Sequence, residues 1–320
     1  MNDIIVKLGK IGIVPVVALE DAADALDLGR ALMAGGIPCA EVTFRTAAAE
    51  ESIRILTKEL PDMLTGAGTV LTTEQVDRAV GAGAKFIVSP GYNPRVVDYC
   101  ISKNIPVVPG CSTPSDIEMA IEAGLDVVKF FPAEAAGGLP MIKAMAAPYG
   151  NVKFMPTGGI NSSNICNYLA FNKIIACGGS WMVDKKLVAA KNFDEITRLS
   201  KEAVDTILGF ELAHVGVNID DADSAAKDAD RLQQLFGFAR KDGNSSIFAG
   251  SGLELTKVKF PGANGHVAIR TNSVERAMFH LEMRGAKFDP DSAKRDEKGN
   301  IKTIYLAEEF GGFAFHLVQK

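Results

Sequence analysis

A lysine lies in the middle of a strongly apolar segment, Val127-Val-Lys-Phe-Phe131. Such a position is unusual, because burying an ammonium group without a partner is energetically costly. If the segment is a strand, its alternation places Val127, Lys129 and Phe131 on one face. Burial favours the uncharged amine, which can attack a carbonyl carbon. Lys129 is therefore a candidate Schiff-base residue; the alternative is a lysine that extends its ammonium group to solvent at a sheet edge.

A second segment, Cys39-Ala-Glu-Val-Thr-Phe-Arg45, carries charged residues at strand spacing. The two-residue period places Glu41, Thr43 and Arg45 on one face. A carboxylate beside a Schiff-base lysine can move protons, and an arginine can bind an anionic substrate group by a bidentate contact. The alternative is a structural ion pair. Because residues 1–213 contain no histidine, Glu41 is the predicted general base.

Two glycine pairs follow later apolar segments, in Thr157-Gly-Gly-Ile160 and in Gly178-Gly-Ser180. Paired glycines can expose backbone N–H groups, and such groups bind phosphate. Tight turns also use paired glycines, so one pair alone has little meaning. Two pairs at the ends of consecutive predicted strands indicate a phosphate site.

The elements that must position these residues recur regularly through residues 1–209. Short apolar runs begin near Ile13, Ala40, Thr65, Phe86, Pro106, Val127, Phe154 and Ile174. Each interval has room for one strand, one amphipathic helix and two short loops. Eight such units predict a (β/α)8 TIM barrel, in which the chemistry lies at the carboxyl ends of the strands. The alternative is an open doubly wound sheet, although no GxGxxG motif follows the first run.

The composition excludes several other classes of protein. The chain has 320 residues, which predicts about two domains. Its 34 basic and 39 acidic residues give a net charge of −5, so we expect no nucleic-acid partner. Five cysteines without CxxC spacing indicate neither a disulfide framework nor a structural zinc site. Lys7 interrupts any signal peptide, and the uncharged run 154–172 contains proline, glycines and asparagines, so we expect a cytoplasmic protein without membrane contact.

Several segments of the first 208 residues together resemble the 2-keto-3-deoxy-6-phosphogluconate / 4-hydroxy-2-oxoglutarate (KDPG/KHG) aldolase family. The similarity lies in motif order and spacing as well as in the motifs themselves. The motifs are Glu41-Val-Thr-Phe-Arg45, Gly66-Ala-Gly-Thr-Val70, Ser89-Pro-Gly91, Val128-Lys-Phe-Phe-Pro-Ala-Glu134, Pro156-Thr-Gly-Gly-Ile160 and Gly178-Gly-Ser-Trp181.

The resemblance implies roles for individual residues. Lys129 corresponds to the Schiff-base lysine and Glu41 to the acid/base residue. Arg45 and Thr69 correspond to the clamp on the pyruvyl carboxylate. Two further residues, Pro90 and Phe131, would line the pocket. The distal end of the substrate, including a phosphate, would be held by Thr157, Gly158, Gly159 and Ser180.

The resemblance also implies a reaction and an assembly. The substrate would be a small keto acid, cleaved to pyruvate and glyceraldehyde 3-phosphate or to pyruvate and glyoxylate. An iminium on Lys129 would accept the electron pair of the broken bond, so we expect no cofactor in the barrel. Members of this family are commonly trimers, which implies a homotrimer here.

The rest of the chain contains an internal repeat. Residues 212–256 and 265–318 each read as a strand, a helix and further strands, and each opens on His-Val-x-(Val/Ile). A repeat of this size predicts a duplicated module. The predicted domains are therefore residues 1–209 and 210–320.

The repeat resembles the vicinal oxygen chelate family of glyoxalases, epimerases and extradiol dioxygenases. The resemblance implies an α+β domain of paired βαβββ modules, whose first and last strands carry metal ligands. The matching positions are His214, Glu254, His266 and His316. Their nitrogen and oxygen donors suit a divalent Zn, Mn, Fe or Ni ion. His280, on the second predicted helix, is expected to be an exposed surface residue.

The function of this second domain stays open at the level of sequence. A lone strand histidine is more often structural than a metal ligand. One alternative is a metal-dependent isomerase, lyase or dioxygenase that acts on a related keto acid. The other is a non-catalytic module for oligomerisation or ligand binding.

Overall fold

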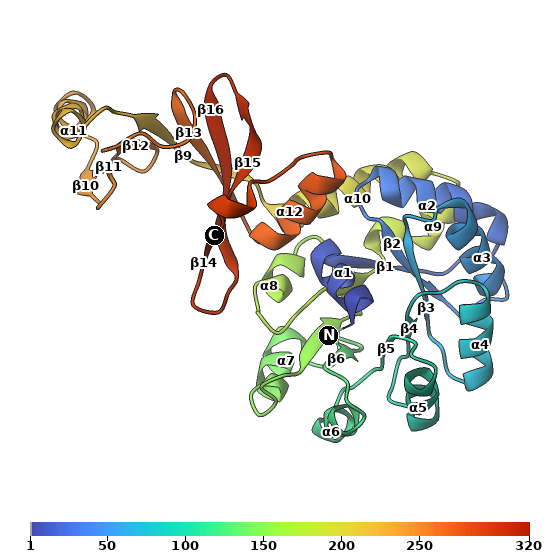
Figure 1. Cartoon of the computed structure of the whole chain (residues 1–320). Helices are drawn as coiled ribbons and strands as arrows, with labels where there is room; N and C mark the ends of the chain where they lie inside the picture. The colour runs from blue at the N-terminus through green and yellow to red at the C-terminus, as the bar shows by residue number, and fades with distance from the viewer. Residues whose placement is uncertain (1) are drawn as a thin grey trace. The chain divides into compact units, whose positions relative to one another are not determined.

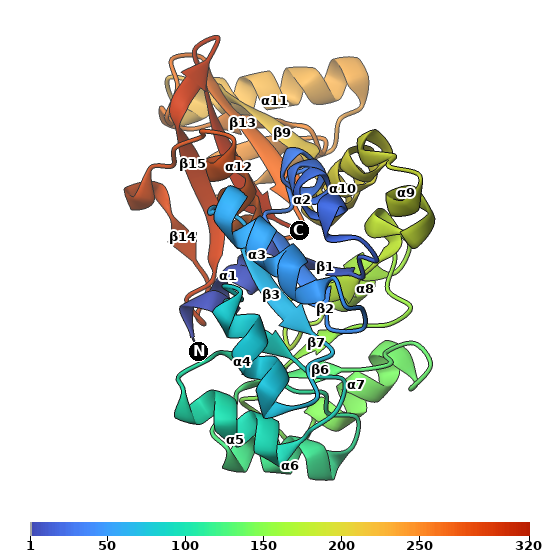
Figure 2. The same ribbon diagram turned by 90° about the vertical axis from the view of Figure 1, so that its right-hand side faces the viewer.

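The chain folds into two compact units in the computed structural model, which describes residues 2–320 (Figures 1 and 2). The division falls between Ile207 and Leu208. The sequence analysis placed the boundary between residues 209 and 210, two residues later.

The described part of the amino-terminal unit, residues 2–207, contains eight strands, and each begins within three residues of the start expected from the apolar runs. All pairings among them are parallel. The strands are β1 (Ile13–Val17), β2 (Cys39–Thr43), β3 (Leu64–Gly68), β4 (Ile87–Val88), β5 (Val107–Val108), β6 (Val127–Phe130), β7 (Lys153–Pro156) and β8 (Cys177–Gly179).

These strands form a curled parallel sheet. Six of them pair in the order β5-β4-β3-β2-β1-β8, and β6 pairs with β7. Isolated bridges from Gly110 to Lys129 and from Thr157 to Gly178 connect the β6–β7 pair to β5 and β8. The first strand therefore lies between the second and the last, which excludes the open doubly wound order, where the strand sequence reverses at a switch point.

One helix precedes the first strand of this unit, and the others follow strands. They are α1 (Asp3–Ile11), α2 (Ala25–Ala34), α3 (Ala49–Glu59), α4 (Thr73–Gly81), α5 (Pro94–Ser102), α6 (Pro114–Glu122), α7 (Gly138–Ala146), α8 (Ile165–Leu169), α9 (Lys185–Ala189) and α10 (Phe193–Leu208). Short 3-10 helices cover Ala22–Asp24 and Trp181–Val183. Thr72, Asn93 and Thr113 start α4, α5 and α6 by accepting a backbone N–H from the first turn, as good N-cap residues do.

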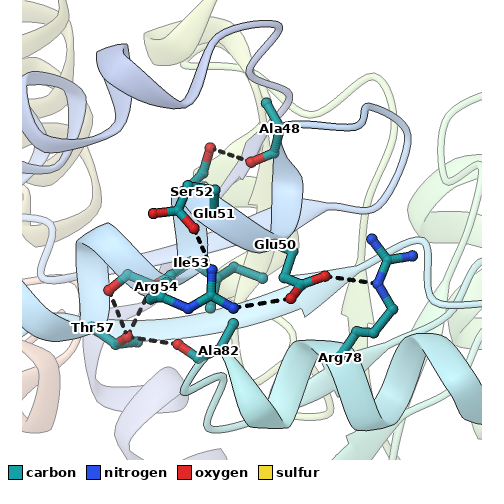
Figure 3. Close-up of polar contacts among 9 residues, drawn as sticks. All are labelled: Ala48, Glu50, Glu51, Ser52, Ile53, Arg54, Thr57, Arg78 and Ala82. Carbon is teal, nitrogen blue, oxygen red and sulfur yellow. Dashed lines mark hydrogen bonds and ion pairs between the residues drawn. The ribbon is translucent and has the colours of Figure 1, made fainter.

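Polar contacts join neighbouring helices on the outside of the sheet (Figure 3). Glu50 on α3 accepts hydrogen bonds from Arg78 Nε of α4 at 2.7 Å and from Arg54 at 3.0 Å. Those bonds hold the pKa of Glu50 below its usual range. Thr57 Oγ1 donates to the carbonyl of Ala82 at 2.9 Å. Exposed ion pairs contribute little stability, so apolar packing onto the sheet holds these helices in place.

The carboxyl-terminal unit is mostly sheet, and its two halves have the same element order. The first half contains β9 (Glu211–Asn218), α11 (Ala222–Phe236), β10 (Arg240–Asp242), β11 (Ser246–Ala249) and β12 (Leu253–Thr256). The second half contains β13 (Gly265–Thr271), α12 (Val274–Met283), a 3-10 helix (Pro290–Ser292), β14 (Lys294–Arg295), β15 (Ile301–Phe310) and β16 (Phe313–Gln319).

The eight strands of this unit form one sheet in the order β10-β11-β12-β9-β13-β16-β15-β14. In each half the first strand pairs in parallel with the last, β9 with β12 and β13 with β16. The halves meet where β9 pairs antiparallel with β13. The first and last strands of both halves therefore lie next to one another at the centre of the sheet.

The exposure expected for His280 is wrong. This residue is fully buried on α12, three residues after Ala277 and six after Val274, which are buried as well. Residues at this spacing share one face of a helix. The burial of His280 therefore follows from its position on the buried face of α12, and not from its polar residue type. Among residues 2–320, no helix is both long enough and apolar enough to cross a membrane.

Candidate active site

The structure brings the strand lysine and the strand glutamate into contact. Lys129 Nζ of β6 lies 3.1 Å from Glu41 Oε1 of β2, and both side chains are buried. Since β2 and β6 are not neighbours in the sheet, this contact crosses the inside of the curl. Glu41 Oε2 has no hydrogen-bond partner among the described residues. A buried carboxylate with one free oxygen can accept a proton from a third group beside the amine.

Glycines of β3 make room for this pair. A Cβ atom on Gly68 would lie 2.2 Å from Glu41 Oε1, and one on Gly66 would lie 2.3 Å from the ring of Phe86. Any larger residue at position 68 would displace the carboxylate from Lys129. The sequence analysis quoted these glycines within a motif but assigned no role to them.

The residues expected to clamp a carboxylate follow two adjacent strands. Arg45 is exposed, and its Nε donates to Thr43 Oγ1 at 3.1 Å; Thr43 in turn donates to the carbonyl of Val17. Thr69 directly follows β3 and has a φ angle of +53°. A β-branched residue in this region is strained, and such strain is concentrated at functional sites. Because the strands are parallel, Arg45 and Thr69 lie at the same edge of the sheet.

Phe131 and Pro90 also follow the carboxyl ends of strands. The ring of Phe131 has its centroid 5.5 Å from Lys129 Nζ, within the range of a cation–π contact. Pro90 is half-buried after β4. Its carbonyl oxygen would lie 2.0 Å from a Cβ atom on Gly110, so only glycine allows this approach.

The residues expected to hold the distal end of a substrate follow β7 and β8. Thr157 is buried, and its Oγ1 has no hydrogen-bond partner among the described residues. Gly178 allows β8 to approach it, since a Cβ there would lie 2.3 Å from that oxygen. Gly158 and Gly159 have φ angles of +101° and +81°, and Ser180 is exposed directly after β8.

Sequence reasoning missed two polar residues beside the glycine pair. The side-chain amides of Asn161 and Asn164 donate to the carbonyl of Gly159 at 3.3 and 3.0 Å. The asparagines were used only to exclude a membrane span. The available signal was their position directly after the glycine pair, where a side-chain amide can reach a loop carbonyl.

A second polar cluster lies in the carboxyl-terminal unit. His214 of β9, His266 of β13 and His316 of β16 each offer a ring nitrogen within 4.8 Å of the others. Glu254 of β12 joins them, because its Oε2 lies 2.9 Å from His214 Nε2 and 3.0 Å from His266 Nε2. The four residues proposed as ligands therefore meet at the centre of the sheet.

The electrostatics of this cluster favour a charged Glu254 and a neutral His316. Burial opposes the charge of Glu254, but hydrogen bonds from His214, His266 and Ser246 outweigh it and hold the pKa of this carboxyl well below its usual range. Ser246 Oγ donates to Glu254 Oε1 at 2.5 Å. Burial and the neighbouring His266 and His214 lower the pKa of His316 to about 4.

Two features of the cluster suit a metal ion: an unpartnered histidine nitrogen and the distances between the candidate ligand atoms. His316 Nε2 is buried without a hydrogen-bond partner among the described residues. Two ligands of a tetrahedral ion at about 2.1 Å lie about 3.4 Å apart, so the histidine nitrogens, which lie within 4.8 Å of one another, need to close by about 1.4 Å at most. Gly216 leaves room for the ring of His266, since a Cβ atom there would lie 2.0 Å from it.

Comparisons with known proteins identify the amino-terminal unit. Residues 4–199 match the family model described as KDPG and KHG aldolase. A 2-dehydro-3-deoxy-phosphogluconate aldolase of Haemophilus influenzae is 52% identical over 206 residues, which cover 64% of this chain and 97% of that protein. A KHG/KDPG aldolase of Escherichia coli is 41% identical over 193 residues, covering 60% of this chain and 91% of that protein.

A solved structure has the same fold. The crystal structure of KDPG aldolase from Legionella pneumophila, with pyruvate captured at low pH as a covalent carbinolamine intermediate, is 39% identical and superposes with a TM-score of 0.61. The match covers 62% of this chain and 97% of that one. The curled parallel sheet is thus the KDPG aldolase fold, and the chain belongs to the KDPG and KHG aldolase family.

Proposed function

We propose that the amino-terminal unit is a class I aldolase that cleaves 2-keto-3-deoxy-6-phosphogluconate (KDPG) to pyruvate and glyceraldehyde 3-phosphate, and 4-hydroxy-2-oxoglutarate (KHG) to pyruvate and glyoxylate. The observation that carries the proposal is the buried contact of 3.1 Å between Lys129 Nζ and Glu41 Oε1. The names of the relatives and the carbinolamine of the Legionella protein support it. We interpret the curled sheet as a closed (β/α)8 barrel, because bridges join the β6–β7 pair to its neighbours on both sides.

In the first step the neutral amine of Lys129 attacks the C2 ketone of the substrate. The resulting carbinolamine loses water and becomes an iminium ion. Arg45 and Thr69, at the same edge of the sheet, bind the neighbouring carboxylate, for which the guanidinium offers a bidentate contact. Phe131 packs beside the reacting nitrogen.

In the second step Glu41 accepts the proton of the C4 hydroxyl group. The C3–C4 bond breaks, its electron pair moves into the iminium to form an enamine, and the aldehyde leaves. The Glu41 carboxyl then returns a proton to C3, and hydrolysis of the iminium releases pyruvate and the free amine of Lys129. Because the iminium accepts the electron pair, the reaction needs no cofactor.

The distal end of the substrate lies against the residues after β7 and β8. Thr157 and Ser180 offer hydroxyl groups, and Gly158 and Gly159 bring backbone close to the ligand without side chains. The unpartnered Thr157 Oγ1 supports a polar ligand there. We therefore expect a phosphorylated six-carbon keto acid to be preferred over KHG.

The experiment is to measure pyruvate release from KDPG and KHG with a coupled lactate dehydrogenase assay. We expect cleavage of both, with the larger specificity constant for KDPG. Release of pyruvate from neither would overturn the proposed function. Equal specificity constants for the two substrates would contradict the proposed phosphate site but not the aldolase function.

A second proposal concerns the carboxyl-terminal unit, which we interpret as a vicinal-oxygen-chelate-like domain of paired βαβββ modules. The repeated strand pairing supports it. His214, Glu254, His266 and His316 would hold one divalent ion of Zn, Mn, Fe or Ni. Such an ion polarises substrate oxygen atoms as a Lewis acid. Metal analysis of the purified chain tests the site: about one ion per chain supports it, and metal-free protein favours a binding or oligomerisation module.

If the metal is present, two roles are still open for this unit. It would act as an isomerase, lyase or dioxygenase on a related keto acid, or bind such a ligand without catalysis. Turnover of keto acids by a Lys129→Met chain, in which the barrel is inactive, separates the two roles.

The assembly that we propose is a homotrimer, on the strength of the family resemblance. Light scattering on a size-exclusion column measures the mass directly. A mass of about three chains supports the proposal, and a monomer contradicts it.

A further inference from the structure

The loop after β7 has its first carbonyl groups bound by the protein. The carbonyl of Thr157 accepts a hydrogen bond from the N–H of Ala133 at 2.8 Å. The carbonyl of Gly158 accepts one from the N–H of Glu134 at 3.0 Å. Both donors belong to the loop after β6, so this loop orients the first part of the glycine loop.

The next carbonyl, that of Gly159, is held by side chains. Asn164 Nδ2 donates to it at 3.0 Å and Asn161 Nδ2 at 3.3 Å. The same pair is joined by a bond from the N–H of Asn161 to Asn164 Oδ1 at 2.9 Å. Two side-chain donors on one loop carbonyl leave its peptide plane little freedom to rotate.

The loop is also confined by the side chain of Glu134. A Cβ atom on Gly159 would lie 2.5 Å from Cγ of Glu134, so the loop passes directly over that side chain. The hydroxyl of the buried Tyr168 donates to the Glu134 carboxylate. The burial of Tyr168, followed by this hydrogen bond, raises the pKa of its hydroxyl, which therefore stays protonated as a donor.

The N–H groups of the same peptides are free. We find no hydrogen bond from the N–H of Gly159 or of Ile160 to any of the residues 2–320. In a trans peptide the N–H points away from the carbonyl of the preceding residue. Holding the carbonyls of Gly158 and Gly159 against the protein therefore directs the N–H groups of Gly159 and Ile160 to the other side. Adjacent N–H groups with a common direction bind anions.

We infer that Asn161 and Asn164 are positioning residues for the distal anionic group of the substrate, and that the N–H they orient is that of Ile160. The inference rests on the proposed aldolase function and deepens it. Neither asparagine touches the substrate in this account. Each acts through the Gly159 carbonyl, so its loss should weaken binding of the phosphate and leave the chemistry at Lys129 intact.

The test compares Asn164→Ala and Asn164→Asp with the wild type on two substrates of the same carbon chain, KDPG and unphosphorylated 2-keto-3-deoxygluconate. Aspartate keeps the acceptor for the N–H of Asn161 but loses the donor to Gly159. We expect both variants to raise KM for KDPG about tenfold or more, the scale of a hydrogen bond to a charged group. We expect kcat for KDPG, and kcat/KM for the unphosphorylated substrate, to change by less than about twofold.

The matched control is Asn167→Ala. Asn167 is an exposed asparagine on the same short helix, α8, and we expect no change on either substrate. Trapping of pyruvate on Lys129 with borohydride checks each variant independently of the phosphate. Loss of trapping in both Asn164 variants would overturn the inference, because Asn164 would then support the barrel rather than the loop.

The other outcomes distinguish failure of this inference from failure of the proposed aldolase function. Equal losses on both substrates, or no loss on KDPG, would overturn the inference while the aldolase stands. A wild type that cleaves both substrates with equal KM would overturn the phosphate site and the inference together. A wild type that cleaves neither would overturn the proposed function itself.

Discussion

The two polar clusters of this protein differ in how their buried charges are balanced. In the amino-terminal unit one amine and one carboxyl group, those of Lys129 and Glu41, pair with each other at 3.1 Å. In the carboxyl-terminal unit one carboxylate, Glu254, accepts from two imidazoles, while the buried Nε2 of a third, His316, has no hydrogen-bond partner within residues 2–320. The first arrangement is neutral by itself, and the second has lone pairs that a cation satisfies.

The clusters also differ in how the sheet assembles them. Lys129 and Glu41 come from strands that are separated in the sheet order, and only its curl brings them together. The histidines and Glu254 come from four strands that are direct neighbours, β12-β9-β13-β16. A curled sheet thus builds an enclosed pair for covalent chemistry, whereas neighbouring strands present several donors to one point.

The largest expected effect is that of Lys129→Met, because it removes the nucleophile. We expect cleavage to fall on the order of a thousandfold or more, and borohydride with pyruvate to trap no adduct. Mass spectrometry of the wild type should find the reduced adduct on Lys129. Lys58→Met, a change at an exposed lysine of α3, is the control and should behave as wild type. Full activity of the Lys129 variant would end the Schiff-base assignment.

Glu41→Gln should have the next largest effect. Loss of a positioned proton acceptor slows turnover by about 10²–10⁴-fold, whereas the amide keeps the size of the side chain beside Lys129. Steady-state rates and pyruvate trapping measure the two properties separately. Weak trapping combined with normal turnover would show that Glu41 is only the structural partner of Lys129.

The carboxyl-terminal cluster should respond to the loss of one ligand. We expect His266→Ala and Glu254→Gln to weaken binding of a divalent ion at least about tenfold, measured by zinc titration calorimetry. Glu309→Gln, at an exposed position of β15, is the matched control. Unchanged affinity in both variants would show that these residues do not form the binding site of the ion.

The smallest effect should be that of a chelator on cleavage. Because the iminium on Lys129 accepts the electron pair, treatment with EDTA should change pyruvate release by less than about twofold. The same treatment should strip any metal from the carboxyl-terminal unit, as metal analysis can show. Aldolase activity that disappears with the chelator would contradict the Schiff-base mechanism and with it the contrast between the two clusters.

Local pattern was enough to predict the strands and the direction of their side chains. The alternation in 127–131 and in 39–45 depends only on the two-residue period of a strand, and it placed Lys129 with Phe131, and Glu41 with Arg45, on one face of each strand before any fold was known. The strand starts in the amino-terminal unit follow from apolar runs in the same way. Repeated element order likewise indicated a duplicated module in residues 210–320.

The local pattern could not predict contacts between segments that are distant in the sequence. The need for glycine at position 68 arises from the Glu41 carboxylate on another strand. The role of Asn164 depends on a carbonyl that its amide reaches only after the loop has folded.

By itself the sequence determined which residues can do chemistry and which face of each strand carries them, because residue type and backbone period are local properties. Only the tertiary structure decided which atoms meet: Lys129 Nζ with Glu41 Oε1, and the four donors of β12, β9, β13 and β16. The physical reason is that hydrogen bonds and ion pairs act over about 3 Å. Whether two atoms come that close depends on strand order, sheet curl and the space left by glycines, which are properties of the folded chain as a whole.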